Sequence, residues 1–170
     1  MKKQTVLYNV VFPIWLMVLF PTTWIAVIPL NLLVDFLVMF ITLKALKTEH
    51  TKLCIKKAII PVWLFGFLSD FIGVGILFST YLIGLIPALS ESDAYNDILG
   101  ALTMNPFENI WALLWTLAAI AVAGVMIYIF NRFISFRKLP IENKEKNTLA
   151  LSLAVCTAPY LFLLPTGLFY

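Results

Sequence analysis

The stretch from Ile110 to Phe130 reads IWALLWTLAAIAVAGVMIYIF and contains no charged residue. As a helix rising 1.5 Å per residue, it is about as long as the hydrocarbon core of a bilayer is thick, roughly 30 Å. Glu108 stands just before it and Arg132 just after it. Trp111 and Trp115 lie near the acidic end, and tryptophan is enriched where helices leave the membrane. The stretch is therefore predicted to be a transmembrane helix.

The charges of the whole chain are segregated in the same way. All 12 Lys and Arg residues lie in three patches, at Lys2–Lys3, 44–57 and 132–146. The other polar segment, 90–109, carries acidic residues and no basic one. In multi-pass membrane proteins the basic loops remain in the cytoplasm. We therefore predict that the basic patches lie on the inner face of a membrane and that segment 90–109 lies outside it.

The composition favours a membrane protein over a soluble one. The chain is 62% hydrophobic and 12% charged, with a mean hydropathy of +0.96. Soluble domains carry about twice that share of charge, roughly a quarter of their residues. The net charge of +3 does not indicate a nucleic-acid partner, because the basic residues are confined to segments that flank apolar stretches. The lipid bilayer is the partner that these numbers predict.

The first apolar stretch, residues 6–43, is interrupted only by Asp35. One helix of this length would measure about 57 Å, nearly twice the hydrocarbon core. Both flanks are basic, so two helices joined by an outer turn are expected. Pro29-Leu30-Asn31 is the preferred turn because proline cannot continue a helix ladder, and Pro21-Thr22-Thr23 is the competing site. No small-residue cleavage site follows the run, so its first helix is interpreted as retained.

Three further crossings complete the predicted topology. Residues 58–89 pass from a basic flank to the acidic one, so a single long helix is expected there. The fold class is thus predicted to be all-α, a polytopic membrane bundle in one domain with a cytoplasmic N-terminus and an external C-terminus. The five predicted helices are 6–28, 31–46, 58–88, 110–131 and 149–168, with cytoplasmic loops 44–57 and 132–147 and external loop 90–109. The bacterial cytoplasmic membrane is the expected location.

Two carboxylates inside the predicted membrane helices, Asp35 and Asp70, are the leading candidates for function. Counting along the helices from Lys44 and Lys57 places them about 13 Å and 20 Å into the membrane. A charged side chain at such depth costs several kcal/mol, so these residues usually face a bundle interior or water and mark ion pathways. We predict that they bind a small solute or a cation.

Polar neighbours accompany both carboxylates. Asn31 lies one helical turn before Asp35, and Ser69 precedes Asp70. Both neighbours are candidate ligands of the same site. Two alternatives remain at this point: each Asp is protonated or hydrogen-bonded and only stabilises the bundle, or one Asp pairs with Arg132 or with a cation of a partner chain.

Small residues at helical spacing predict close helix packing. They are Ala119, Ala123 and Gly124 in the fourth predicted helix, and Ala150, Ala154 and Ala158 in the fifth. Such rows let helix backbones approach each other in lipid. Packing within this chain is the favoured use, and packing in a homo-oligomer or a larger membrane complex is the alternative.

His50 and Cys54 stand four residues apart in a predicted cytoplasmic loop. A thiol needs a nearby base to become an effective nucleophile. A Cys/His pair on the inner face of a small polytopic protein is similar to that of the membrane endopeptidases that process quorum-sensing propeptides, and this resemblance implies a cysteine peptidase. The first interpretation of the loop is nevertheless that its lysines determine topology.

The predicted function is a binding or transport component for a small solute or cation. The first alternative is a non-catalytic accessory or assembly subunit of a larger membrane complex, and the second is the cytoplasmic-face peptidase. No phosphate-binding loop, dinucleotide turn or metalloprotease motif occurs in the sequence. One His and two Cys cannot build a usual protein-only zinc site. We therefore expect no cofactor, no metal and no enzymatic activity.

Overall fold

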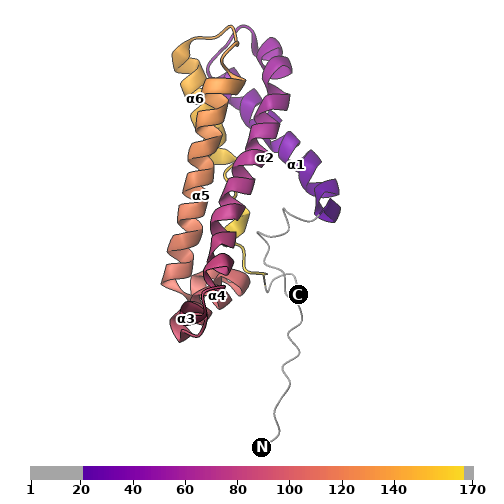
Figure 1. Ribbon diagram of the computed structural model, residues 1–170. Coiled ribbons are helices and arrows are strands. Elements are labelled where there is room, and N and C mark those ends of the chain that lie inside the picture. Colours follow the sequence, from indigo (N-terminus) through magenta and orange to yellow (C-terminus); the bar gives the residue numbers. More distant parts are fainter. Residues whose placement is uncertain (1–20, 167–170) are drawn as a thin grey trace, which may run out of the picture.

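The computed structural model describes residues 21–166, and every regular element in that range is helical (Figure 1). The helices are α1 (Pro21–Ala45), α2 (Thr51–Ile83), α3 (Pro87–Ser90), α4 (Asp93–Met104), α5 (Ile110–Phe130) and α6 (Asn143–Cys156). Three single turns complete the chain: a 3-10 turn at Pro106–Glu108, a π-helical turn at Asn131–Ser135 and a 3-10 turn at Tyr160–Leu163. The all-α class is confirmed for the described range.

Three of these helices are long and apolar enough to cross a membrane. They comprise Val27–Ala45 of α1, all of α2, and α5 with its π-helical turn. Their outward side chains are large and apolar, as Ile41, Ile60 and Val125 illustrate, each more than half exposed. A soluble monomer rarely exposes contiguous apolar surface on this scale, whereas lipid solvates it. The surface therefore suits a bilayer.

The basic patches of the described range lie at one end of the bundle, together with Glu49, Glu142 and Glu145, and the segment that carries acidic residues alone lies at the other end. The turn between α1 and α2 and the turn between α5 and α6 lie together at the top of Figure 1, whereas α3 and α4 lie at the other end. The first two turns belong to the basic patches, and the α3–α4 segment is the acidic one. Segments 44–57 and 132–146 are thus side by side, and 90–109 is remote from both.

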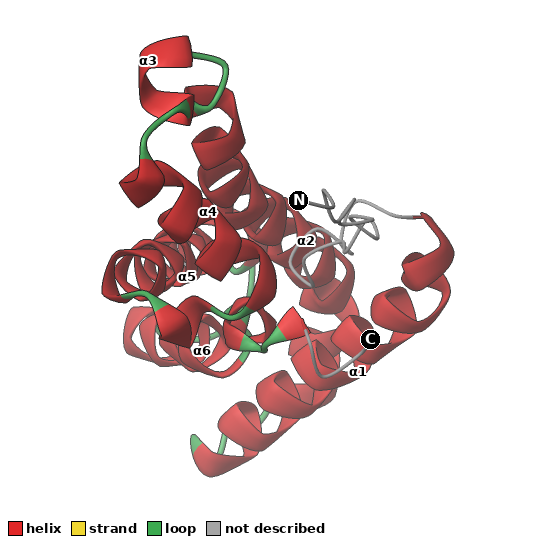
Figure 2. Ribbon diagram, turned by 90° about the horizontal axis from the view of Figure 1, so that it is seen from below, coloured by secondary structure: helices red, strands yellow, loops and turns green. Residues whose placement is uncertain are grey.

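Helices α2 and α5 form the central pair, with the most extensive contact in the fold. Helix α6 packs on α5, and α1 packs on α2 and α6. Figure 2 looks along the bundle from the α3 and α4 end and shows α1 inclined to the other long helices. One buried cluster lies toward the basic end and contains Met39, Leu43, Val62, Phe136 and Leu149, and a second, toward the acidic end, contains Leu77, Leu102, Ala119 and Phe162.

The preferred outer turn at residues 29–31 is wrong. Helix α1 continues through Pro29 without a break. The competing site at residues 21–23 lies at the edge of the described range, whose first residue, Pro21, is already helical. Proline is tolerated inside membrane helices when neighbouring helices supply hydrogen bonds. The carbonyl that loses its helical donor at Pro29 is that of Ile25. The Trp63 indole of α2 donates to a different carbonyl, that of Ile28, at 3.3 Å, and this bond ties α1 to α2 next to the proline. Because α1 takes residues 21–28, the predicted helix 6–28 keeps only residues 6–20, which lie outside the described range.

The predicted helices on either side of α5 also have different bounds. Helix α2 starts at Thr51, so much of the predicted loop 44–57 is helical. Helix α6 starts at Asn143, where Glu142 and Glu145 form a capping box, and it ends at Cys156. The predicted helix 149–168 is therefore not a single helix. Pro159 explains the early end, because it lacks an amide hydrogen and disfavours helical geometry in the preceding residue.

Candidate functional site

Asp35 lies on the face of α1 that packs against α2. Its side chain retains only 5% exposure, in a helix whose other side carries exposed apolar residues. One carboxylate oxygen, Oδ2, lies 3.7 Å from the position that a Cβ atom would occupy on Gly66 of α2. Because Gly66 has no side chain, α2 presents bare backbone to this carboxylate. Asp35 is therefore enclosed between two helices instead of facing lipid.

Asp70 lies on α2 one helical turn beyond Gly66, so the two residues share a face of the helix. Its Oδ1 atom is buried and has no hydrogen-bond partner within residues 21–166. Asp35 packs against Gly66 and therefore faces the same side of α2 as Asp70 does. The structure thus brings the two predicted carboxylates, from separate helices, to the same side of the α1–α2 contact.

The chemistry of such a pair follows from its surroundings. An ionised carboxylate inside a bilayer is costly, and two close ionised carboxylates repel each other more strongly there than in water. A proton or a small cation held between them removes both penalties. A buried acceptor oxygen without a donor is itself unfavourable, so the free Oδ1 of Asp70 is suited to take up a positively charged ligand.

The polar neighbours of the two carboxylates, Asn31 and Ser69, differ in whether their side chains are free to bind a ligand. Asn31 is half-buried and lies one turn before Asp35 on the same row of α1. Ser69 is fully buried, but its hydroxyl donates to the Phe65 carbonyl at 2.7 Å within its own helix. The hydroxyl hydrogen of Ser69 is therefore committed to the backbone. The candidate site reduces to Asp35 and Asp70, with Asn31 next to them.

The small residues pack helices within this chain. A Cβ atom on Gly73 of α2 would lie 3.4 Å from Ala123 Cβ and 3.5 Å from the Ala119 carbonyl oxygen. On the α6 side, a Cβ atom on Gly124 would lie 3.4 Å from the Ala154 carbonyl oxygen and 3.9 Å from Ala158 Cβ. Ala150 is fully buried in the cluster at the basic end. The α2–α5 and α5–α6 contacts therefore both use the small side chains that the sequence singled out.

His50 and Cys54 do not form an accessible pair. Cys54 is fully buried in the cluster at the basic end, and its amide donates to the His50 carbonyl in the first turn of α2. The His50 side chain is exposed to solvent. A substrate peptide has no access to a thiol inside the core, so the geometry does not favour a nucleophilic role for Cys54.

The burial of Cys54 predicts unequal reactivity of the two thiols, because Cys156 is exposed on α6. N-ethylmaleimide added to the protein in mild detergent should modify one thiol per chain, and the second only after unfolding in sodium dodecyl sulfate. Intact mass measures both steps. In the control variant Cys156→Ala, labelling of the native protein should disappear. Fast modification of Cys54 in that variant would contradict its buried position.

Asn131, at the start of the π-helical turn, is one of the buried polar residues that sequence reasoning missed. It is fully buried, and its Nδ2 group donates to the Ile127 carbonyl at 2.9 Å, while its Oδ1 has no partner in the described chain. An amide directly after an uncharged transmembrane stretch was the available signal. In the same range, no three His, Cys, Asp or Glu side chains gather in a metal-binding group.

Comparison with known proteins adds no further constraint. The chain matches no protein family, no curated protein and no solved structure. The functional argument therefore rests on the geometry above.

Proposed function

We propose that this chain is a multi-pass integral membrane protein that binds and moves a proton or a small cation at Asp35 and Asp70. The observation that carries the proposal is the placement of two carboxylates, from α1 and α2, on one side of a helix contact, with one oxygen buried and unpartnered. Membrane ion and proton pathways are marked by such residues. The test is flux into proteoliposomes with and without both carboxylates.

The two carboxylates have different roles in binding the ligand. Asp35, enclosed between helices, supplies a fixed negative group against the bare backbone of Gly66. Asp70 is half-buried, so it is the member of the pair through which a ligand enters and leaves. The bound ligand and the carboxylates neutralise each other, which lowers the free energy of placing the charged ligand inside the bilayer. Binding and release then alternate as the two sides of the membrane become accessible.

The proposed topology keeps the basic turns in the cytoplasm of a bacterial cell. Helices α1, α2 and α5 account for three of the five proposed crossings. A fourth crossing is proposed for α6 with the described segment that follows it, and the remaining crossing of the sequence-based count falls on residues 6–20, outside the described range. An inner N-terminus and an outer C-terminus follow from this count and from the rule that basic loops remain inside.

Single cysteines at exposed positions test this topology. In a background of Cys54→Ala and Cys156→Ala, we expect Asn96→Cys to react with a membrane-impermeant maleimide on intact cells. Lys52→Cys and Lys138→Cys should react only after permeabilisation, because they lie at the opposite end of the bundle. Gel-shift labelling measures the outcome. Labelling of positions 52 and 96 from the same side would refute the proposed crossings.

A second candidate function is an accessory subunit of a membrane complex. A groove of about 390 Å³ between α5 and α6 supports it, because the lining is nearly all apolar and includes Val125, Leu151 and Val155, each more than half exposed. A groove of this kind suits a helix of another chain. Native mass spectrometry after extraction in mild detergent separates the two functions, since a stoichiometric foreign partner favours the subunit.

A further inference from the structure

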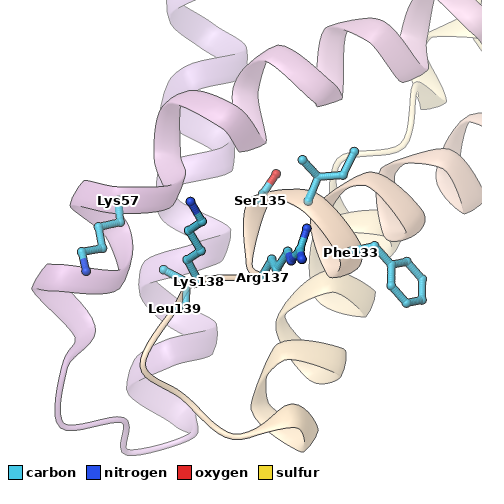
Figure 3. A pocket seen from close by; sticks show the side chains of 7 residues that line it. Lys57, Phe133, Ser135, Arg137, Lys138 and Leu139 are labelled. Atoms are coloured by element: carbon cyan, nitrogen blue, oxygen red, sulfur yellow. The ribbon is translucent and has the colours of Figure 1, made fainter.

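A cavity of about 480 Å³ lies at the basic end of the bundle, where α2 and the segment after α5 meet. Its lining consists of Lys57, Phe133, Ile134, Ser135, Arg137, Lys138 and Leu139. Figure 3 shows Lys57 projecting from α2, with Ser135, Arg137 and Lys138 on the segment opposite. Three cationic side chains thus surround one cavity, and no carboxylate lines it. The electrostatic character of the cavity favours an anion.

Two further cationic side chains of the segment after α5, Arg132 and Lys146, are engaged elsewhere. The Arg132 guanidinium donates to the side-chain oxygens of Asn147 and Asn143. The Lys146 ammonium is buried and donates to the Arg137 carbonyl at 3.2 Å, which holds the segment that carries Arg137 and Lys138 in place. The cavity is therefore built on a fixed backbone, and the cations that line it are a separate set.

Ser135 adds a donor that has no partner. It is only 9% exposed, it lines the cavity, and its Oγ makes no hydrogen bond within residues 21–166. Elsewhere in this chain, buried hydroxyls in helices donate to the carbonyl four residues earlier, as Ser69 and Thr116 do. At Ser135 that carbonyl belongs to Asn131, and the π-helical turn gives it to the amide of Phe136 at 2.9 Å. The π-helical turn thus leaves this buried hydroxyl without its usual acceptor within the helix.

The surroundings of the cavity are those of a membrane interface. It lies at the ends of two membrane-spanning helices, and the adjacent Phe133 and Ile134 side chains are 61% and 51% exposed. Apolar side chains beside a basic cavity suit a ligand with an anionic head and a hydrocarbon tail. Basic pockets between transmembrane helices on the cytoplasmic side bind phospholipid head groups in this way.

We propose that this cavity is a binding site for a phosphate group, held by Lys57, Arg137 and Lys138 and hydrogen-bonded by the Ser135 hydroxyl. The phosphate of an anionic phospholipid is the source that the exposed apolar rim favours. Free phosphate shares the same chemistry and is distinguished by experiment. This site is separate from the carboxylate pair, so its function does not depend on ion movement through the membrane.

The test is binding to the full chain in non-ionic detergent, measured by calorimetry. The probes are dioctanoyl phosphatidylglycerol, dioctanoyl phosphatidylcholine and inorganic phosphate. We expect saturable 1:1 binding of phosphatidylglycerol. In the variant Lys57→Gln, Arg137→Gln, Lys138→Gln, its affinity should fall roughly 100-fold, because each of the three basic residues contributes about a factor of five. The control Lys52→Gln, Lys56→Gln, Lys144→Gln removes the same charge from exposed positions outside the cavity and should retain most of the affinity.

Ser135→Ala tests the site without any change of charge. The loss of a hydrogen bond to a charged group should weaken phosphatidylglycerol binding about 10-fold, whereas thermal stability should not fall, because the hydroxyl has no partner in the unliganded fold. Stronger binding of the glycerolipid than of inorganic phosphate assigns the site to a lipid, and equal binding assigns it to soluble phosphate. Equal losses in the cavity and control variants, or no saturable binding of either anion, would overturn the proposal.

Discussion

Replacement of Asp35 and Asp70 together by asparagine is expected to reduce cation and proton flux to the level of protein-free liposomes. Asparagine has nearly the same shape as aspartate, but it neither ionises nor exchanges a proton. The change therefore removes the charge of the pair and leaves the α1–α2 packing intact. Proteoliposomes loaded with a pH-sensitive dye, and given in turn a proton, Na⁺ or K⁺ gradient, measure the flux.

The single variants and a matched control make this result specific. Asp70→Asn should also raise thermal stability or leave it unchanged, because a neutral amide is less costly to bury than a carboxylate. Asp93→Asn and Asp97→Asn together make the same change in charge on exposed residues of α4 and should leave flux as it was. If the double variant of the pair conducts as well as the unmodified protein does, the carboxylates serve assembly alone.

Substitution of Gly73 by leucine is expected to cause the largest loss of stability in the bundle, about 3 kcal/mol or more, because it overpacks a close helix contact. A Cβ atom there would already lie 2.9 Å from Phe162 Cε2 and 3.4 Å from Ala123 Cβ. The remaining atoms of leucine would have to force α2 and α5 apart. Thermal unfolding in detergent, followed by circular dichroism, measures the effect.

The control is Gly75→Leu, two residues further along the same helix. No atom lies within 4 Å of a Cβ at Gly75, and the residue is exposed to the lipid side. Leucine there should be neutral or mildly stabilising, since glycine costs about 1 kcal/mol relative to good helix formers. Equal destabilisation by the two variants would show that the α2–α5 contact is looser than the structure indicates.

The local sequence was sufficient to predict the bounds of α5 but not those of α1. An uncharged stretch between an acidic and a basic segment has one stable arrangement in a bilayer, and the helix predicted over 110–131 is found at Ile110–Phe130. Pro29 was interpreted as a break because the local rule for proline is a rule for helices in water. Trp63, from a distant segment, donates to the Ile28 carbonyl and fixes α1 against α2, and such a long-range contact is not visible in a single sequence.

The candidate site, too, could be predicted from the sequence only in part. Asp35 and Asp70 could be identified because a charge in an apolar stretch is conspicuous, but their proximity depends on how α1 crosses α2. The available Ser135 hydroxyl could not be predicted, since it results from one π-helical turn in a stretch without a distinctive pattern. Cys54 was expected in a loop exposed to the cytoplasm. Much of that loop is helix instead, and the helix turns the thiol inward.

Helix α2 is longer than a membrane requires, and this length links the protein to the thickness of its bilayer. Its uncharged part beyond Lys57, apart from Asp70, extends about 39 Å from Ala58 to Ile83, against a core of roughly 30 Å. Hydrophobic mismatch of this size is relieved by tilting or by local thickening of the lipid. A thicker bilayer holds α2 more upright, and the face that carries Gly66 and Asp70 rotates with it. We therefore expect the spacing of the two carboxylates to depend on the length of the lipid acyl chains.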